Sequence, residues 1–304
     1  MRLEYIHGKL TYIIDTLHCI DNKYKGSCYC LHKLAYELAN LGNIVYIFSE
    51  PIYQHSNIRV IPCYSENFFN DNFIKSYRWD QFEFDIFKTV SVYTQITWGN
   101  PFGTHFNTRW LLHDCEDEKF NSFGENDLVC NFGNFKTPKE INQQKLTIFD
   151  YQLDNFYDKK LETRKGFGHI LHKKTPDWAN SFLQKFESVE IPHHNGLNNI
   201  DYLNDEFNKY EYILTFDDKT YYTSIANLCG AKSIILNEDQ NLSPTEYRLQ
   251  NPTNMFGVSY GLNDIEWSRK TLHLVRDHLS ELKKIDYKTV VNFNNYWYDK
   301  LSKT

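Results

Sequence analysis

The sequence of 304 residues lacks the features that disordered, fibrous and membrane-spanning proteins share. Its 13 glycines and 8 prolines are too few for a collagen-like or low-complexity chain. No run of about 18 apolar residues occurs, so we expect no transmembrane segment. The first nine residues lack the charged-then-apolar order of a signal peptide. We therefore expect a cytoplasmic protein, and peripheral attachment to a membrane stays open.

The sequence also lacks an excess of positive charge. Its 33 Lys and Arg against 39 Asp and Glu give a net charge of −6, and nucleic-acid binding needs a basic face, so we expect no nucleic-acid partner. The seven cysteines are an odd number, and Cys130 and Cys229 follow apolar residues, which is typical of buried thiols in a reducing compartment. Cys28, Cys30 and His32 are spaced too closely for a zinc site, so no metal is expected.

Aromatic residues are abundant and indicate a globular chain with a large core. The 22 Phe, 22 Tyr and 6 Trp carry far more apolar area than a disordered chain has. The length fits two domains of ordinary size. Residues 10–15 and 43–48 are apolar runs that predict strands, and between them leucines and an alanine recur at helical spacing from 31 to 41. This order is a βαβ unit with a parallel strand pair.

The same alternation continues through the chain. Apolar runs predict strands at 58–63, 91–98, 110–113, 128–132, 146–149, 168–172, 188–191, 212–216 and 232–236, and helices at 177–186, 220–228, 265–282 and 287–300. The class is therefore α/β, with two Rossmann-like domains. We place the first domain at 1–155, the second at 156–285 and a final helix at 286–304, with the charged stretch 150–165 as the hinge.

A short turn follows the strand predicted at 212–216 and leads into a helix. Asp217, Lys219 and Thr220 form this turn. Ligands of open α/β sheets bind outside the carboxyl ends of the strands, and free N–H groups at the start of a helix favour phosphate. The turn is therefore a candidate phosphate site, although Asp and Thr also serve as plain helix caps.

Two further segments carry candidate residues. Arg164 and Lys165 precede a glycine and a strand, and Arg binds phosphate with two N–H groups, although a basic surface turn would look the same. A Gly-Asn-Pro turn that contains Asn100 is followed by Arg109 and an apolar strand, which ends in His113 and Asp114. A histidine at a strand end is a possible catalytic base, and a surface histidine is the alternative.

Several motifs are absent. The sequence has no G-x-G-x-x-G, no G-x-x-x-x-G-K-[ST] and no G-x-S-x-G. Their absence weakens the interpretations as a dinucleotide dehydrogenase, a P-loop NTPase and an α/β-hydrolase.

Taken together, the segments resemble GT-B glycosyltransferases, in particular bacterial and viral enzymes that build surface polysaccharides. The resemblance spans nearly the whole chain. The sequence departs from the family in two places. The first loop has one glycine, Gly26, where many members have a pair, and the paired-glutamate motif of many retaining members is absent around 217–230. Whether the reaction is inverting or retaining therefore stays open. The segments that carry it are Gly26 with 31–46, Gly99–Leu112, Arg164–Gly166, Asp217–Gly230 and Gly257–Arg269.

The resemblance implies two Rossmann-like domains that face each other across a cleft, and a hexosyl- or deoxyhexosyltransferase. The donor would be a nucleotide-diphosphate sugar bound by the second domain, and no metal or other cofactor would be needed. Thr220 would hold the diphosphate with Arg164 and Lys165, and Asp217 and Lys219 would complete the donor site.

The first domain would then bind a glycan or glycolipid acceptor. The resemblance assigns Gly26, Asn100 and Arg109 to the loops around the reacting sugar, and His113 or Asp114 would be the base of an inverting enzyme. The final helix would cross back to the first domain. Two other interpretations stay open, a sugar-nucleotide epimerase on a similar fold and a non-catalytic carbohydrate-binding protein.

Overall fold

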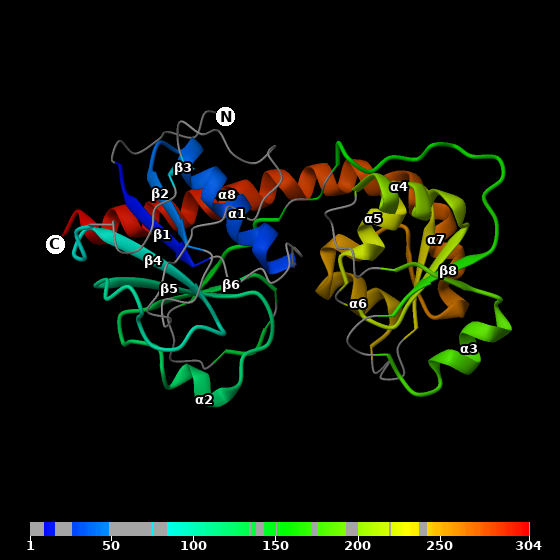
Figure 1. The fold of residues 1–304 in the computed structure, drawn as a ribbon, viewed down its shortest axis with the longest axis horizontal. Helices are drawn as coiled ribbons and strands as arrows, with labels where there is room; N and C mark the ends of the chain where they lie inside the picture. Colours follow the sequence, from blue (N-terminus) through cyan, green and yellow to red (C-terminus); the bar gives the residue numbers. More distant parts are fainter. Residues whose placement is uncertain are drawn as a thin grey trace. The chain divides into compact units, whose positions relative to one another are not determined.

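The computed structural model divides the chain into two compact units (Figure 1). Unit 1 consists of residues 1–150 and 284–304, and unit 2 of residues 151–283. The acceptor and donor roles expected for the two domains stay predictions. The structure describes residues 9–15, 26–48, 74–75, 84–133, 135–137, 143–149, 151, 153–171, 175–192, 200–218, 220–236 and 242–303.

Unit 1 is built on a parallel sheet of seven strands in the order β3-β2-β1-β4-β5-β6-β7. Its residues are largely β-branched or aromatic, and the central strands are buried on both faces, as parallel sheets require. The elements are β1 (Thr11–Asp15), α1 (Gly26–Asn40), β2 (Ile44–Phe48), β3 (Ile74–Lys75), β4 (Thr89–Thr94), β5 (Phe106–Leu111), α2 (Asp117–Phe120), β6 (Leu128–Asn131) and β7 (Gln143–Lys145).

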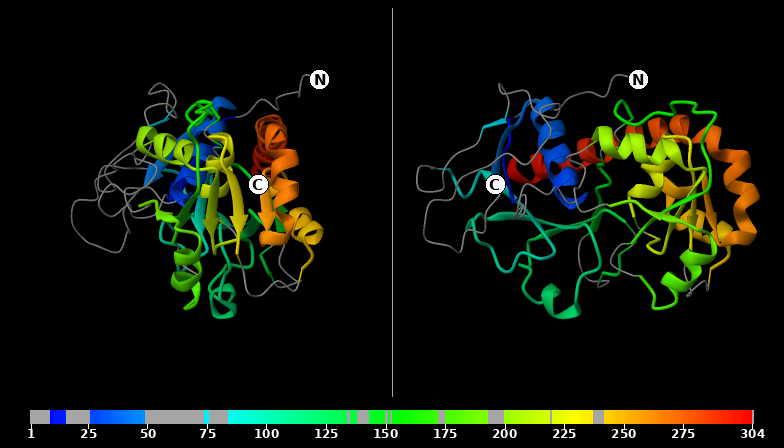
Figure 2. Two further views of the ribbon diagram at one scale, coloured as in Figure 1. Left: turned by 90° about the vertical axis from the view of Figure 1, so that its right-hand side faces the viewer. Right: turned by 45° about the vertical axis from the view of Figure 1, so that its right-hand side comes forward.

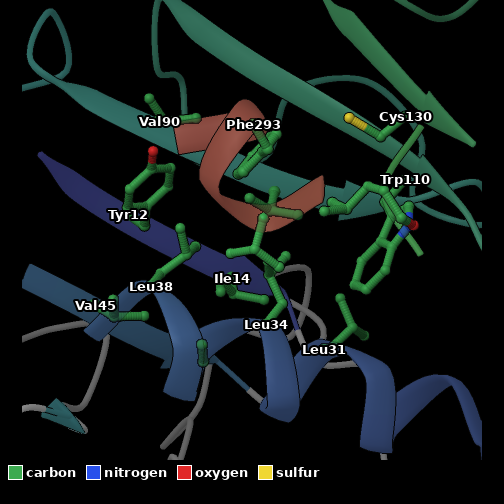
Figure 3. Packing of buried hydrophobic residues seen from close by; sticks show 14 of the residues in the cluster. Tyr12, Ile14, Leu31, Leu34, Leu38, Val45, Val90, Trp110, Cys130 and Phe293 are labelled. Carbon is green, nitrogen blue, oxygen red and sulfur yellow. The ribbon is translucent and has the colours of Figure 1, made fainter. Parts of the chain in front are cut away.

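The core of unit 1 lies between one face of this sheet and two helices, α1 and α8 (Val275–Leu301) (Figure 3). Leu31, Leu34 and Leu38 form the apolar stripe of α1 and are fully buried. Phe293 and Trp297 of α8 pack against the same face. The part of α8 that follows unit 2 in the sequence, residues 284–301, therefore completes the core of the first sheet.

A polar cluster fixes α8 in this position. Asn294 Oδ1 accepts a hydrogen bond from the Tyr12 hydroxyl at 3.0 Å and another from Asn43 Nδ2 at 2.8 Å. The Trp297 indole donates to Thr108 Oγ1 at 3.0 Å. Since unpaired buried polar groups are costly, these bonds select one register of α8 on the sheet.

The opposite face of the unit 1 sheet carries no long helix within the described ranges. Ile13 and Tyr93 pack there against Phe102, which belongs to the loop after β4. Further along, Val129 packs against Phe120 of the short helix α2. Loops therefore cover this face.

Unit 2 is built on a parallel sheet of five strands in the order β12-β11-β10-β8-β9, with helices around it (Figure 2). Alternation places Leu214 and Phe216 on the face that packs against α3 and α7, whereas Ser233 on the other face donates to the Thr223 carbonyl of α5 at 3.1 Å. The elements are β8 (Phe167–Ile170), α3 (Ala179–Lys185), β9 (Val189–Glu190), α4 (Ile200–Lys209), β10 (Tyr212–Thr215), α5 (Tyr222–Leu228), β11 (Lys232–Ile235), α6 (Pro244–Gln250), β12 (Val258–Tyr260) and α7 (Ile265–Thr271).

The predicted α/β class with two Rossmann-like sheets is confirmed. The predicted helices at 265–282 and 287–300 are corrected to α7, a short 3₁₀ turn and one continuous α8, because no Gly or Pro interrupts residues 275–301. The sequence interpretation missed α4, α6 and β12.

One predicted strand of unit 1 is wrong. The edge strand forms earlier, as β7 at Gln143–Lys145, and ends just before this run. The Leu146 N–H still donates to the Asn131 carbonyl of β6 at 3.1 Å, and Leu146 and Ile148 are buried in the core. The strand predicted at 58–63 lies outside the described residues.

Candidate functional site

Each sheet has one point where the strand order reverses, and such a point is where open α/β sheets bind ligands. In unit 1 the chain runs outward from β1 through β2 to β3 and then returns to β4 on the other side of β1. In unit 2 it runs from β8 to β9 and returns to β10 on the other side of β8. The chain therefore has two candidate sites, at the carboxyl ends of β1 and β4 and of β8 and β10.

The predicted turn lies at the reversal point of unit 2. Thr220 is buried, and its Oγ1 accepts from the main-chain N–H of Tyr222 at 3.3 Å, so it supports the first turn of α5. Asp217 is half-buried directly after β10. Lys219 lies outside the described residues.

Two neighbouring side chains donate hydrogen bonds to the backbone of this turn. The Asp218 carbonyl accepts from the Tyr247 hydroxyl and from Asn254 Nδ2, the latter at 3.4 Å. Burial raises the pKa of Tyr247, so its phenol keeps its proton and remains a hydrogen-bond donor. The turn is therefore held in one conformation, which favours binding.

The structure does not bring Arg164 and Lys165 together with Thr220. Both basic residues precede β8, whereas Thr220 follows β10, and these two strands are parallel neighbours. Residues before and after parallel strands lie at opposite edges of the sheet. Arg164 instead bonds Asp158 Oδ1 at 2.8 Å and Asn208 Oδ1 at 3.0 Å, close to Gly230 after the carboxyl end of α5. A cation there stabilises the helix dipole.

His113 and Asp114 follow the carboxyl end of β5, the strand next to β4. Both side chains are exposed, and His113 Nδ1 lies 2.7 Å from the Asp114 carbonyl oxygen. This is one strand away from the reversal point of unit 1. Their role as a catalytic base stays a prediction.

Two residues predicted in loops have other positions. Gly26 is the first residue of α1 rather than part of a loop, and residues 16–25 before it lie outside the described residues. Arg109 lies inside β5 and is 1% exposed, so no ligand reaches it directly. Its Nε donates to Asp127 Oδ2 at 2.7 Å, a pair that neutralises the buried guanidinium.

Asn100 is exposed in the loop after β4, as predicted, but its amide serves the loop itself. Its Oδ1 accepts from the Tyr93 hydroxyl at 2.9 Å, and its Nδ2 donates to the Thr104 carbonyl at 2.7 Å. These bonds hold the loop in a fixed conformation. A direct role of Asn100 toward a sugar stays a prediction.

The sequence interpretation missed the residues at the reversal point of unit 1. Asp15 is the last residue of β1, and its Oδ2 accepts from Thr97 Oγ1 at 3.0 Å. Thr94 ends β4 and is fully buried, and its hydroxyl has no hydrogen-bond partner within the described chain. A carboxylate that ends an apolar strand run is the signal in the sequence that could have found Asp15.

Neither a metal cluster nor a membrane-spanning helix is found in the part of the chain that the structure describes. Among those residues, no group of three or more His, Cys, Asp and Glu is placed to hold a metal ion. The described helices include none that is both long and apolar enough to cross a membrane. Independence of metal stays a prediction.

Comparison with known proteins gives structural similarity alone. No family model and no curated protein matches the chain. The solved structure of the glycotransferase of kitacinnamycin is similar at a TM-score of 0.48 and 9% identity, over 95% of this chain and 99% of that one. A calicheamicin glycosyltransferase is similar at a TM-score of 0.43 and 10% identity, over 97% of this chain and 100% of that one.

Proposed function

We propose that the protein is a glycosyltransferase that moves a hexosyl or deoxyhexosyl group from a nucleotide-diphosphate sugar to a glycan or glycolipid acceptor, in the synthesis of a surface polysaccharide. The observation that carries this proposal is the pair of parallel sheets, each with its own reversal point. A transfer between two substrates needs two binding sites in one chain. The sequence resemblance to GT-B enzymes supports the same assignment.

The donor site of this proposal is the turn after β10. Its carboxylate, Asp217, accepts hydrogen bonds and repels phosphate, so it fits a ribose or sugar hydroxyl better than the diphosphate. The Thr220 hydroxyl and Lys219 are the groups in this turn that suit the diphosphate. Arg164 and Lys165 lie at the other edge of the sheet, so this proposal does not use them.

The reaction itself needs a base, an electrophilic sugar carbon and a stabilised leaving group. In an inverting reaction the acceptor oxygen attacks the anomeric carbon, its proton passes to a base, and the bond to the diphosphate breaks. His113 and Asp114 are the proposed bases at the edge of unit 1. Fixed donors around the departing diphosphate supply the stabilisation that a metal would otherwise give.

The first experiment is a thermal-shift panel with UDP, GDP, dTDP, CDP and NAD on the purified full chain. A ligand that binds only the folded state raises the Tm by mass action. We expect a shift with one nucleoside diphosphate and none with NAD. Thr220→Val should weaken that nucleotide by about 3- to 10-fold, the cost of one hydrogen bond. Arg164→Ala, a matched change at the other edge of the sheet, should leave the nucleotide Kd unchanged.

Assays of sugar-nucleotide turnover and of glycan binding distinguish the transferase from an epimerase and from a carbohydrate-binding protein. Conversion of a sugar nucleotide without any acceptor would identify an epimerase and overturn the proposal. Binding of a glycan without nucleotide binding or turnover would identify a carbohydrate-binding protein. Loss of nucleotide affinity in Arg164→Ala together with an unchanged Thr220→Val would place the donor at the opposite edge.

A further inference from the structure

An exposed tryptophan lies in the loop that follows β4, at the reversal point of unit 1. In this loop Trp98 exposes 52% of its surface, whereas Thr97 beside it is buried. Scattered exposed apolar residues are normal and need no explanation. Trp98 differs from them because two side chains, those of Arg109 and Lys119, donate hydrogen bonds to the backbone of its loop.

Arg109 holds the backbone of this loop from within the sheet. Its Nη1 donates to the Thr97 carbonyl at 3.3 Å, and its Nη2 donates to the Gly99 carbonyl. These two carbonyls belong to the residues before and after Trp98. The guanidinium itself is fixed by Asp127 and by the ring of Tyr93, whose centroid lies 4.8 Å from Arg109 Cζ. A buried cation therefore sets the position of an exposed indole.

Lys119 of α2 fastens the same loop from the other side. Its Nζ lies 5.3 Å from the centroid of the Trp98 ring and donates to the Ile96 carbonyl at 3.2 Å. A cation near an aromatic face is attracted by the ring quadrupole. The indole is therefore restricted before any ligand arrives, which lowers the entropy cost of binding.

A carboxylate is bonded to the residue just before the indole. Thr97, the residue before Trp98, donates through Oγ1 to Asp15 Oδ2 at 3.0 Å. Asp15 ends β1 and thus lies at the reversal point. A carboxylate has acceptor capacity for several hydrogen bonds, so Asp15 can accept from Thr97 and from a ligand hydroxyl as well.

We infer that Trp98 and Asp15 form a sugar subsite of unit 1, in which the apolar face of a pyranose ring stacks on the indole and a ring hydroxyl donates to Asp15. This inference rests on the proposed function, in which the sugar belongs to the acceptor. An aromatic face suits the apolar side of a sugar ring, and a carboxylate suits its hydroxyls. A protein partner would need a wider apolar patch than Trp98 and the neighbouring Ile96 provide.

The test measures saccharide binding directly. Saturation-transfer NMR is recorded on the full chain with lactose, maltose, cellobiose and diacetylchitobiose at about 10 mM, which suits millimolar ligands. We expect at least one disaccharide to bind. Trp98→Ala should weaken it by about tenfold or more, as for a buried aromatic anchor, and Trp98→Phe should retain part of the affinity.

Phe87→Ala is the matched control. Phe87 is an exposed aromatic residue at 63%, and it lies just before β4, whereas Trp98 lies after the same strand. Its removal should leave the disaccharide Kd within about twofold, because it lies outside the anchored contact. Equal losses in both variants, unchanged binding in Trp98→Ala, or no disaccharide bound by the wild type would each overturn the inference.

Thr97→Val and Asp15→Asn examine the carboxylate. Both variants should weaken the same disaccharide by about 3- to 10-fold, the range of one hydrogen bond. Binding is measured well below the Tm of each variant, because Thr97→Val also loses its own bond to Asp15. Unchanged affinity in both would remove Asp15 from the subsite. Nucleoside-diphosphate shifts measured on the same samples separate the two proposals. A Tm shift with a nucleoside diphosphate but no disaccharide binding would support the transferase proposal and reject the sugar subsite. Disaccharide binding without any nucleotide shift would support the subsite and reject the transferase proposal.

Discussion

Each of the two sheets has one reversal point, but the loops at these two points are stabilised in different ways. In unit 2 the turn after β10 is fastened by neutral groups, with the Asp218 carbonyl bonded to the Tyr247 hydroxyl and to Asn254. In unit 1 the loop after β4 is fastened by a buried cation, Arg109, whose charge is balanced by Asp127. A neutral anchor adds little charge to its site, whereas a buried ion pair makes the loop depend on two charges that must stay together.

The largest expected effect comes from breaking that ion pair. Arg109→Ala leaves Asp127 buried without its partner, and we expect a loss of about 3–5 kcal/mol in the free energy of unfolding of unit 1. Arg164→Ala in unit 2 removes a pair whose Asp158 side chain is 45% exposed. We expect about 1 kcal/mol there, since exposed partners are screened by water.

Scanning calorimetry with urea denaturation measures both changes. Nearly equal losses in the two variants would contradict the difference between the units. A double variant of Arg109 and Asp127 to apolar residues should recover part of the stability, because it removes the unpaired charge.

The second comparison concerns the glycines that end one helix in each unit. Gly42 follows α1 with a φ of +89°, and Gly230 follows α5 with a φ of +85°. Gly42→Ala should cost about 1–2 kcal/mol, the penalty of a left-handed residue with a Cβ, since a Cβ there meets nothing within 4 Å.

Gly230→Ala should cost about 1–3 kcal/mol more, because its Cβ would lie 2.6 Å from the Asp158 carboxyl and 2.8 Å from Arg164 Nη1. Urea denaturation of the two variants gives both values. If Gly230→Ala is no less stable than Gly42→Ala, the side chains of Asp158 and Arg164 move away from the new Cβ at little cost in free energy.

The effect that is smallest at neutral pH is a difference in acid sensitivity. Burial lowers the pKa of His32 in unit 1 to about 3, and it lowers that of His169 in unit 2 less strongly, because Glu190 opposes the shift. The unfolded histidine takes up its proton near pH 6.5 while the folded one stays neutral, so stability is present above that pH and falls as the pH drops. The slope is about 1.4 kcal/mol per pH unit for each histidine.

Unit 1 should therefore lose stability from about pH 6.5 down to about pH 3, and unit 2 over a narrower window that begins at the same pH. Unfolding free energies measured at half-unit steps of pH give the two slopes. His32→Gln should flatten the slope of unit 1 alone, and His169→Gln that of unit 2 alone. A steeper slope on acidification in either variant would contradict the assignment.

The sequence predicted the alternation of strands and helices because buried parallel strands are nearly uninterrupted apolar runs. It also predicted the turn at Asp217 and Thr220, because the strand before it and the helix after it are both distinct in the sequence. The sequence could also have predicted that Arg164 lies far from Thr220. A residue before one parallel strand and a residue after the neighbouring strand lie at opposite edges of the sheet. The order of the predicted strands along the sequence is enough to separate Arg164 from Thr220 in this way.

The candidate site of unit 1 was harder to predict. The strand expected at 110–113 is β5 at Phe106–Leu111, and this shift turned Arg109 from a loop residue into a buried one. Its partner Asp127 is 18 residues away, and its other acceptors are main-chain carbonyls. Such contacts have no periodic signal in one sequence, because tertiary packing alone brings them together.

The division of unit 1 has a consequence for the order of events during synthesis. Unit 2 is continuous from 151 to 283, whereas unit 1 needs residues 284–304 as well. Phe293 and Trp297 belong to the core of the first sheet, and they leave the ribosome after all of unit 2. Domains made first usually fold first. Here the earlier sheet waits with an open apolar face until α8 arrives, so a pause in translation before residue 284 prolongs its exposure to chaperones and to aggregation.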